Sequence, residues 1–113
     1  MATDVKAKYR FCRVSPQKAR LVINLVRGKP VVEAISTLKF VQKSAARHLR
    51  QLLLSAVSNA EENFGLNRDN LYIHYLVADE APTRKWRRFG ARGRFKPILR
   101  RSSHISIVLR EQA

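Results

Sequence analysis

The stretch RKWRRFGARGRFKPILRR, residues 84–101, holds nine Lys or Arg residues among its eighteen and no acidic residue. It is bounded by two β-rich runs, LYIHYLVADE (71–80) and SHISIVLRE (103–111), and the second alternates apolar and polar residues as a half-buried strand does. If the two runs pair antiparallel, residues 80–103 form one hairpin connection, far longer than the usual ~2–5 residues. A connection of this length without a core of its own is either disordered or functional. The sequence therefore predicts a small sheet from which a long basic β-hairpin extends.

Three features of the basic segment favour a ribbon that becomes ordered on a partner. Arg92, Arg94 and Lys96 alternate along the chain as in a strand, and GARG (90–93) places turn-forming glycines near the midpoint. Large apolar residues stand among the bases, where a solvated linker has no need of them: Trp86, Phe89, Phe95 and Ile98. Arms of about ten residues at ~3.3 Å per residue would reach roughly 30 Å beyond the domain. The hairpin is therefore expected to enter its partner.

The charge of the chain indicates what that partner is. Its 113 residues carry 23 Lys and Arg against 8 Asp and Glu, a formal charge of +15, and residues 81–110 contain ten of these bases and no acid. Such a charge repels itself unless a polyanion accompanies it. Phosphate oxygens explain a dense basic ribbon best, because each neutralised phosphate releases counterions and an Arg fork binds two oxygens at once. The aromatic rings between the basic residues can stack on unpaired nucleobases, so a nucleic acid is the predicted partner.

Composition limits the remaining possibilities. A hydrophobic content of 45% supports one modest core in a single domain, residues 1–113. No apolar run approaches the ~20 residues that cross a bilayer, and the N-terminal residues lack the apolar stretch of a signal peptide, so we expect a soluble protein that is not secreted. Cys12 is the single cysteine, which excludes an internal disulfide. We expect it to pack as a small, half-buried strand residue.

The first predicted strand is VKAKYRFCRV (5–14), in which basic and apolar residues alternate. Tyr9 and Phe11 fall together on the apolar side, until Arg13 breaks the pattern. The basic side consists of Lys6, Lys8 and Arg10. This strand is expected to be half buried and to present its bases to solvent or to a partner.

Helix signals flank the next segment, SPQKARLVINLVRGKP (15–30). Ser15 is the predicted N-cap, Pro16 the first helical residue, and Gly28 with Pro30 the stop. The predicted inward stripe is Leu21, Val22, Leu25 and Val26. The residues left largely to the outer face are Lys18, Arg20, Asn24 and Arg27.

Two further helices complete the pattern. VVEAISTLKF (31–40) spaces Val32, Ile35 and Leu38 three residues apart. Residues 42–64 form the longest helical pattern, which ends at Gly65. Its apolar side is Ala45, Leu49, Leu52, Leu53, Ala56, Val57 and Ala60. The predicted fold class is α+β: three helices packed on a small three-stranded antiparallel sheet, with a long extended β-hairpin.

Catalytic and metal sites are not expected. His48 lies on a charged helix side, His74 within a strand and His104 at a strand entrance, without the spacing of a zinc helix or a CxxC pair. Glu61 and Glu62 are neighbours on a helix and point about 100° apart, so they do not form a catalytic pair. A basic nuclease that uses His104 and a lysine is the one enzymatic alternative. We predict no enzyme, no metal and no cofactor.

Three segments together resemble a known family. SPQKARLVINLVRGK, LLLSAVSNAEENFGL and DEAPTRKWRRFGARGRFKPILRRSSHISIVL are similar, in this order and over nearly the whole chain, to the L-twenty-two family of large-subunit ribosomal proteins. The resemblance implies a small domain on the outer surface of the large subunit, with a hairpin that runs inward through ribosomal RNA. It implies partners as well: large-subunit rRNA, neighbouring proteins including ribosomal protein four, and the nascent polypeptide, with no membrane.

The resemblance also assigns residues. The tip that lines the exit tunnel would be Arg92, Gly93, Arg94 and Phe95. The residues expected to bind rRNA are Lys6, Lys8, Arg10, Arg13, Ser15, Lys18, Arg20, Lys29, Arg84, Lys85, Trp86, Arg87, Arg88, Arg92, Arg94, Lys96, Arg100, Arg101 and His104. It further implies early binding during subunit assembly, and a ribosome that is bacterial and cytoplasmic or organellar.

The chain departs from the family pattern at the tip. Phe95 stands where a small residue is common and Lys96 where an acid is common, so a bulky ring and an added charge are expected near the tunnel constriction. Two other classes of function remain open. One is a free RNA chaperone or nucleoid-type protein that acts off the ribosome. The other is a cationic membrane-active protein, disfavoured because the bases stand in strand and turn contexts instead of on one helix face.

Overall fold

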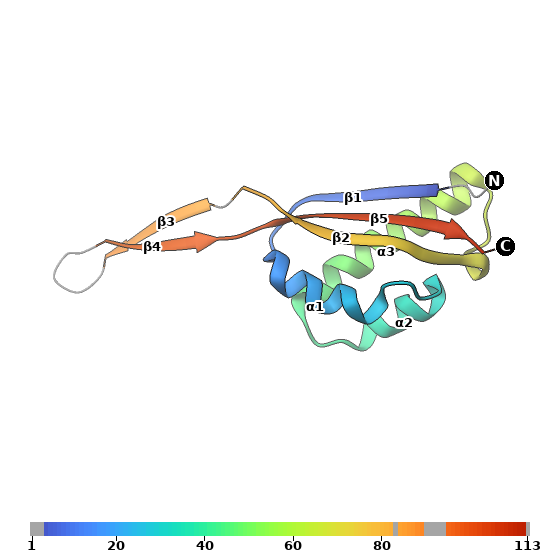
Figure 1. The fold of residues 1–113 in the computed structure, drawn as a ribbon, viewed down its shortest axis with the longest axis horizontal. Coiled ribbons are helices and arrows are strands. Elements are labelled where there is room, and N and C mark those ends of the chain that lie inside the picture. Colours follow the sequence, from blue (N-terminus) through green and yellow to red (C-terminus); the bar gives the residue numbers. More distant parts are fainter. Residues whose placement is uncertain (1–3, 83, 90–94, 113) are drawn as a thin grey trace.

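A three-stranded antiparallel sheet forms one layer of the domain (Figure 1). The computed structural model describes residues 4–82, 84–89 and 95–112, and of residues 84–89 and 95–100 it describes the backbone alone. The strand order is β1 (Asp4–Cys12), β5 (Ser103–Glu111), β2 (Leu71–Glu80). The predicted antiparallel pairing of residues 71–80 with 103–111 is confirmed, because Ile105 lies opposite Ala78 and Ser103 opposite Glu80.

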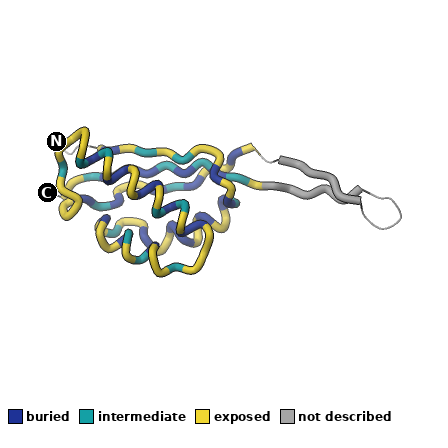
Figure 2. Tube along the Cα trace, turned by 180° about the vertical axis from the view of Figure 1, so that it is seen from behind, coloured by how far each residue is buried: buried dark blue, intermediate teal, exposed yellow. Residues whose placement is uncertain are grey.

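Three helices cover one face of this sheet: α1 (Pro16–Val26), α2 (Val31–Phe40) and α3 (Ser44–Phe64). Helix α3 packs against β1 and β5, and α1 packs against β2. Figures 1 and 2 view the molecule from opposite sides, with α3 behind the sheet in one and in front of it in the other. Within the described residues the opposite sheet face therefore carries no helix. The predicted α+β arrangement of three helices on a three-stranded sheet is confirmed.

The core lies between α3 and the sheet. Ile105, Ile107 and Leu109 alternate along β5 and are buried, while the residues between them face the other side. Every apolar residue predicted for the inner side of α3 is buried: Ala45, Leu49, Leu52, Leu53, Ala56, Val57 and Ala60. The helix ends at Gly65, whose φ of +64° gives the left-handed cap that glycine adopts without strain. Burying a Leu or Ile side chain stabilises a fold by about 1.5–3 kcal/mol, so the buried Leu and Ile side chains of this layer contribute strongly to the stability of the domain.

The signals that start and end α1 act as predicted. The Ser15 side chain accepts a hydrogen bond from the Lys18 backbone N–H at 3.4 Å, and Pro16 is the first helical residue. Beyond the helix Gly28 has a φ of +79°, which turns the chain towards α2. The helix therefore occupies the position that its local sequence specifies.

Its inward face differs from the prediction. The buried residues of α1 are Pro16, Ala19, Val22, Ile23 and Val26. Leu21 and Leu25, predicted to face inward, are 56% and 46% exposed. The stripe formed by 19, 22, 23 and 26 has the helical spacing as fully as the predicted one, and the neighbouring sheet and α3 select between them. In α2 the same correction applies to Val32, which is exposed while Val31, Ala34 and Leu38 are buried.

Strand β1 also departs from the simple alternation. Tyr9 lies opposite Ile105 and Cys12 opposite Ser103, so two residues, Arg10 and Phe11, face the single residue His104. Such a β-bulge reverses the inside–outside pattern beyond it. Phe11, predicted on the apolar side with Tyr9, is exposed as a result, and Cys12, predicted half-buried, is fully buried.

The long hairpin extends from one end of the domain. Strands β3 (Arg84–Phe89) and β4 (Phe95–Arg100) pair antiparallel from Arg84 opposite Arg100 to Phe89 opposite Phe95. The molecule measures 64 × 25 × 18 Å, and its radius of gyration of 17.1 Å exceeds the ~13 Å of a compact domain of this length. The predicted extended hairpin is present over these strands, and residues 90–94 at its tip lie outside the described residues. In the described parts, no helix has both the length and the apolarity to cross a membrane.

Candidate nucleic-acid interface

Strand β1 carries a row of three exposed bases on the sheet face opposite the helices, which we call the basic row: Lys6, Lys8 and Arg10. Val5, one residue before the row, is fully buried against the helices. Because side chains alternate along a strand, the three bases point to the uncovered side, about 6.6 Å apart. The basic row is therefore free to meet a polyanion along the full length of that edge.

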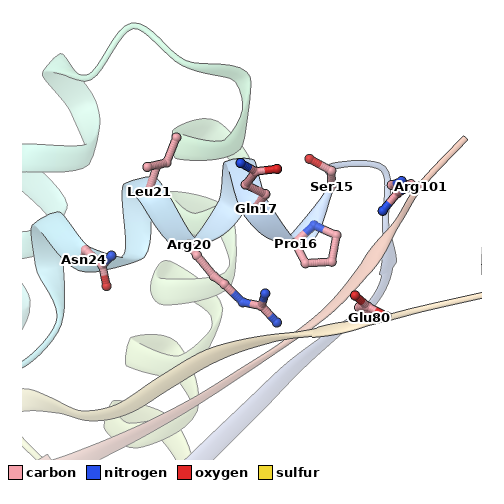
Figure 3. Close-up of a pocket in the computed structure, with 8 residues that line it drawn as sticks. All are labelled: Ser15, Pro16, Gln17, Arg20, Leu21, Asn24, Glu80 and Arg101. Atoms are coloured by element: carbon pink, nitrogen blue, oxygen red, sulfur yellow. The ribbon is translucent and has the colours of Figure 1, made fainter.

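A pocket of about 570 Å³ lies where the hairpin leaves the domain, and we call it the root pocket (Figure 3). It is lined by the first turns of α1 and by the residues on which β2 and β5 leave the sheet: Ser15, Pro16, Gln17, Arg20, Leu21, Asn24, Glu80 and Arg101. The amino end of a helix favours anions, and the first turn of α1 holds no acidic residue. The lining includes two basic residues, Arg20 and Arg101, and one acidic residue, Glu80, so this region is positively charged.

Arg20 is exposed, as predicted, but its side chain also reaches β2. One of its guanidinium nitrogens donates a hydrogen bond of 2.9 Å to the Ala78 carbonyl of β2. Arg27, also predicted on the outer face, donates one of 3.0 Å to the Leu76 carbonyl. Both arginines thus fasten α1 to β2. Arg20 remains an exposed residue on the rim of the root pocket, so its remaining N–H groups are available to a ligand.

The other predicted residues of the domain fall into two groups. Arg13, Ser15 and Lys18 stand at the start of α1, and Arg101 and His104 stand at the start of β5, where the hairpin leaves the sheet. Ser15 and Arg101 line the root pocket together. Lys29 lies apart from this group, after the far end of α1, and its ammonium group is 3.7 Å from the Glu33 carboxylate. Among the predicted residues whose side chains the structure describes, Lys29 lies apart from the rest.

The hairpin places bases opposite bases. Arg84 lies opposite Arg100, and Arg88 opposite Lys96. Like charges directly opposite each other destabilise an antiparallel pair. Pro97 lies within β4, which is compatible with a two-stranded ribbon because each strand is an edge. Arg92, Gly93 and Arg94, predicted at the tip, lie outside the described residues, and Phe95 is described by its backbone alone.

The opposite end of the sheet is held by an ion pair. The Arg110 guanidinium donates hydrogen bonds to the Asp4 carboxylate at 2.7 and 3.2 Å. This hydrogen bond is the main cause that lowers the pKa of Asp4 below its ordinary value. Arg110 is thereby partly neutralised, so this end of the sheet contributes less positive charge than the basic row and the root pocket do.

Phe11 is an exposed residue that the sequence pattern did not predict. It lies between the basic row and Arg13, is 58% exposed, and has a φ of +55°. Its backbone N–H donates a hydrogen bond of 3.0 Å to Nδ1 of His104, and the two rings meet edge to face with centroids 4.7 Å apart. The alternation of the strand placed this residue in the core, and no local signal marks the bulge that turns it outward.

The histidines do not form a catalytic or metal-binding group. His48 of α3 meets the Tyr9 ring edge-on, His74 lies beside Tyr72, and His104 contacts Phe11. Within residues 4–82 and 101–112, no group of three or more His, Cys, Asp or Glu side chains is arranged to hold a metal ion. Burial raises the pKa of the Cys12 thiol, which makes it a poor nucleophile.

Comparisons with known proteins agree with this picture. The family model described as "Ribosomal protein L22p/L17e" matches residues 7–110. Relatives from Thermoanaerobacter sp. (strain X514) and Thermoanaerobacter pseudethanolicus (strain ATCC 33223 / 39E) are each named "Large ribosomal subunit protein uL22". Each is 48% identical over 109 residues, which cover 96% of this chain and 98% of the relative.

Proposed function

We propose, because this chain belongs to the ribosomal protein L22p/L17e family, that its basic row, root pocket and hairpin arms bind large-subunit rRNA. As a member of that family it is a structural constituent of the large ribosomal subunit and not an enzyme. We further propose that residues 1–113 act as one RNA-binding domain that includes the hairpin of residues 80–103. The family relationship shows that the protein is a ribosomal component, and the arrangement of its charges supports the proposed RNA contacts.

The observation that carries the proposal is the register of the hairpin. Two of its six opposed pairs, Arg84 with Arg100 and Arg88 with Lys96, join bases, and residues 81–110 contain no acid that would compensate them. A free ribbon of this kind repels itself, whereas a ribbon among phosphates releases their counterions and gains free energy. The structure therefore contains an element whose charge suits an RNA environment better than water.

The domain surfaces extend this contact. The basic row follows one edge of the sheet. Ser15 and Arg101 line the root pocket, and the exposed Arg13 and Lys18 flank Ser15 in the chain. The rRNA phosphates next to the domain end of the hairpin would lie close to these residues. Lys29 is paired with Glu33, so we assign it a smaller part in binding.

For the hairpin tip the proposal rests on the family resemblance. We propose that Arg92, Gly93, Arg94 and Phe95 line the polypeptide exit tunnel, where they meet the nascent chain and lie near ribosomal protein four. The elongated shape is consistent with an element that reaches into the subunit. We also propose a role in early subunit assembly. Both relatives come from Thermoanaerobacter, which favours a bacterial cytoplasmic ribosome over an organellar one.

Phe95→Ala tests the position of the tip. If the ring faces the lumen, subunits should assemble normally while macrolide sensitivity or peptide-induced stalling changes. If the ring stacks on a base in the tunnel wall, local RNA protection should fall instead. Wild-type behaviour in both assays would contradict the proposed tip.

Two measurements test RNA binding itself. The affinity of the full chain for large-subunit rRNA should fall steeply with salt, with a slope of about −0.7 to −0.9 per neutralised phosphate in a log–log plot. A flat titration would contradict the electrostatic argument. Sedimentation addresses the alternative of an RNA chaperone that acts off the ribosome. The proposal requires stoichiometric association with large subunits that survives moderate salt, and a protein found mainly in the free fractions would favour the chaperone.

A further inference from the structure

Phe11 combines three properties that packing does not explain. Its side chain is 58% exposed, its φ of +55° is in the left-handed region that aromatic residues rarely adopt, and it occupies a β-bulge that turns it away from the core. A glycine would adopt this backbone without strain, and any polar side chain would suit the exposure. An exposed aromatic ring in a strained conformation indicates a functional constraint at this position.

The surroundings of Phe11 fix the ring in place. Its backbone N–H donates to Nδ1 of His104 at 3.0 Å, and the two rings meet at 83° with centroids 4.7 Å apart. The chain beyond the bulge is anchored as well, because the buried Ser103 hydroxyl donates to the Val14 carbonyl at 2.8 Å. An edge-to-face contact covers at most one face of the Phe11 ring. The ring contact and the hydrogen bond restrict how the Phe11 side chain can move, so less entropy is lost when a ligand covers its exposed face.

The position of Phe11 indicates the ligand. It is flanked by the exposed Arg10 and Arg13, and it lies one ladder step from the Cys12–Ser103 pair, next to the point where β5 continues into the hairpin. Asp79 of β2 lies opposite His104, on the side away from Phe11, and is the nearest acid along the ladder. Rigid aromatic rings between basic residues are the usual platform for unpaired nucleobases. The ring stacks on the nucleobase, while the Arg or Lys side chains hold the adjacent phosphates.

We propose that Phe11, positioned by His104, stacks on an unpaired base of large-subunit rRNA at the foot of the hairpin. This inference rests on the proposed function and adds a contact that depends on stacking, whereas the other proposed contacts depend mainly on charge. Arg10 and Arg13 bind the phosphates on either side of the stacked base. His104 acts as a positioning residue, through the hydrogen bond to the Phe11 backbone and the ring contact.

The test compares full-length variants for binding to large-subunit rRNA transcribed in vitro, over a series of salt concentrations. Phe11→Gly removes the ring and suits a positive φ, so the domain should unfold at the same temperature as the wild type or higher. Its affinity should fall about 5- to 150-fold at each salt concentration. The slope of log affinity against log salt should stay unchanged, because a stacking ring neutralises no phosphate. Phe11→Trp should retain wild-type affinity.

Phe40→Ala is the matched control, because Phe40 is 80% exposed at the end of α2 and is not part of the proposed interface. It should bind as the wild type does. His104→Ala should weaken binding, and the double variant with Phe11→Gly should lose little more than Phe11→Gly alone, since both changes act on one contact. Additive losses would contradict the positioning role.

The proposal is wrong if Phe11→Gly binds within about twofold of the wild type, which would mean that the ring meets a protein neighbour or solvent. It is also wrong if the salt slope changes as after loss of a phosphate contact. A second measurement needs no variant: ultraviolet irradiation of assembled subunits should cross-link Phe11 to one base. A flat salt titration of the wild type would instead contradict the proposed function, so the two failures are distinguishable.

Discussion

The two long β-arms of this molecule are stabilised in opposite ways along their length. In the sheet, β5 buries Ile105, Ile107 and Leu109 against the helices. In the hairpin, the same arms continue as β3 and β4, where bases lie opposite bases. Apolar burial stabilises the first part in any aqueous solution, whereas the two opposed pairs of basic residues destabilise the second part unless countercharges are near. The same two arms therefore pass from a part that apolar packing stabilises to a part that a polyanion would stabilise further.

The largest expected effect comes from removing the hairpin. Replacing residues 84–101 with a short Asn-Gly turn should leave the domain folded, because the sheet ladder from Leu71 opposite Glu111 to Glu80 opposite Ser103 remains complete. Affinity for large-subunit rRNA should fall about a thousandfold or more at ~0.1 M salt, since nine bases are lost. Filter binding and thermal unfolding measure the two effects. Loss of cooperative unfolding would show that the hairpin contributes to the core.

A change in the core of the domain should lower stability and leave the salt dependence of RNA binding unchanged. Leu53→Ala removes a buried side chain of α3 and should lower the free energy of unfolding by about 2–5 kcal/mol. Its neighbour Leu54 is 40% exposed, so Leu54→Ala is the matched control and should cost less than about 1 kcal/mol. Urea titration checks both. Under conditions where Leu53→Ala is folded, the salt slope of RNA binding should equal that of the wild type, and a changed slope would contradict the separation of the two parts.

A smaller effect is expected at the start of α1, which lines the root pocket between the two parts. Ser15→Ala removes the side-chain oxygen that accepts from the Lys18 N–H and should cost about 0.5–1 kcal/mol, because the contact of 3.4 Å is long. Ser44→Ala, at the first residue of α3, removes a hydroxyl from a helix whose N-cap makes no side-chain hydrogen bond, and should be nearly neutral. Thermal unfolding compares them. Equal destabilisation would mean that the Ser15 cap does not stabilise α1.

The smallest effect concerns pH. The Arg110 hydrogen bond lowers the pKa of Asp4 in the folded state, so this pair stabilises the fold above the unfolded pKa near 4 and ceases to do so as the pH falls through the lower folded value. The advantage of the wild type over Asp4→Asn in urea midpoint should be present at about pH 6 and vanish towards about pH 2. Arg110→Gln should abolish the same pH dependence. An advantage that persists at low pH would rule out the ion pair as its source.

Local rules predicted most elements because their signals are contained in a few neighbouring residues. The Ser15–Pro16 start and the Gly28 and Gly65 stops required only cap and φ preferences, and strands β2 and β5 followed from β propensity and alternation. The same rules failed where two spacings were equally good. Leu21 and Leu25 satisfy a helical stripe as well as Ala19 and Ile23 do, and only the packing partner distinguishes the two.

The candidate interface was predicted in the same uneven way. The exposed bases of β1 followed from period-two alternation, and the hairpin followed from a charged segment between two strands. The bulge that exposes Phe11 depends on the register of β1 against β5, which lies more than ninety residues away in the chain. The Arg20 contact with β2 depends in the same way on how α1 docks, whereas the pairing of Lys29 with Glu33 is local.

The sequence by itself determined the elements, the α+β class, the excess of positive charge and its concentration between two strands, because these follow from local preferences and from a count of residues. Tertiary structure alone decided which stripe of α1 is buried, that Arg20 and Arg27 fasten that helix to β2, and that Phe11 points outward beside His104. The physical reason is that each of these depends on a partner distant in sequence. A pattern read along the chain contains no distance between such partners, and only the packed fold supplies it.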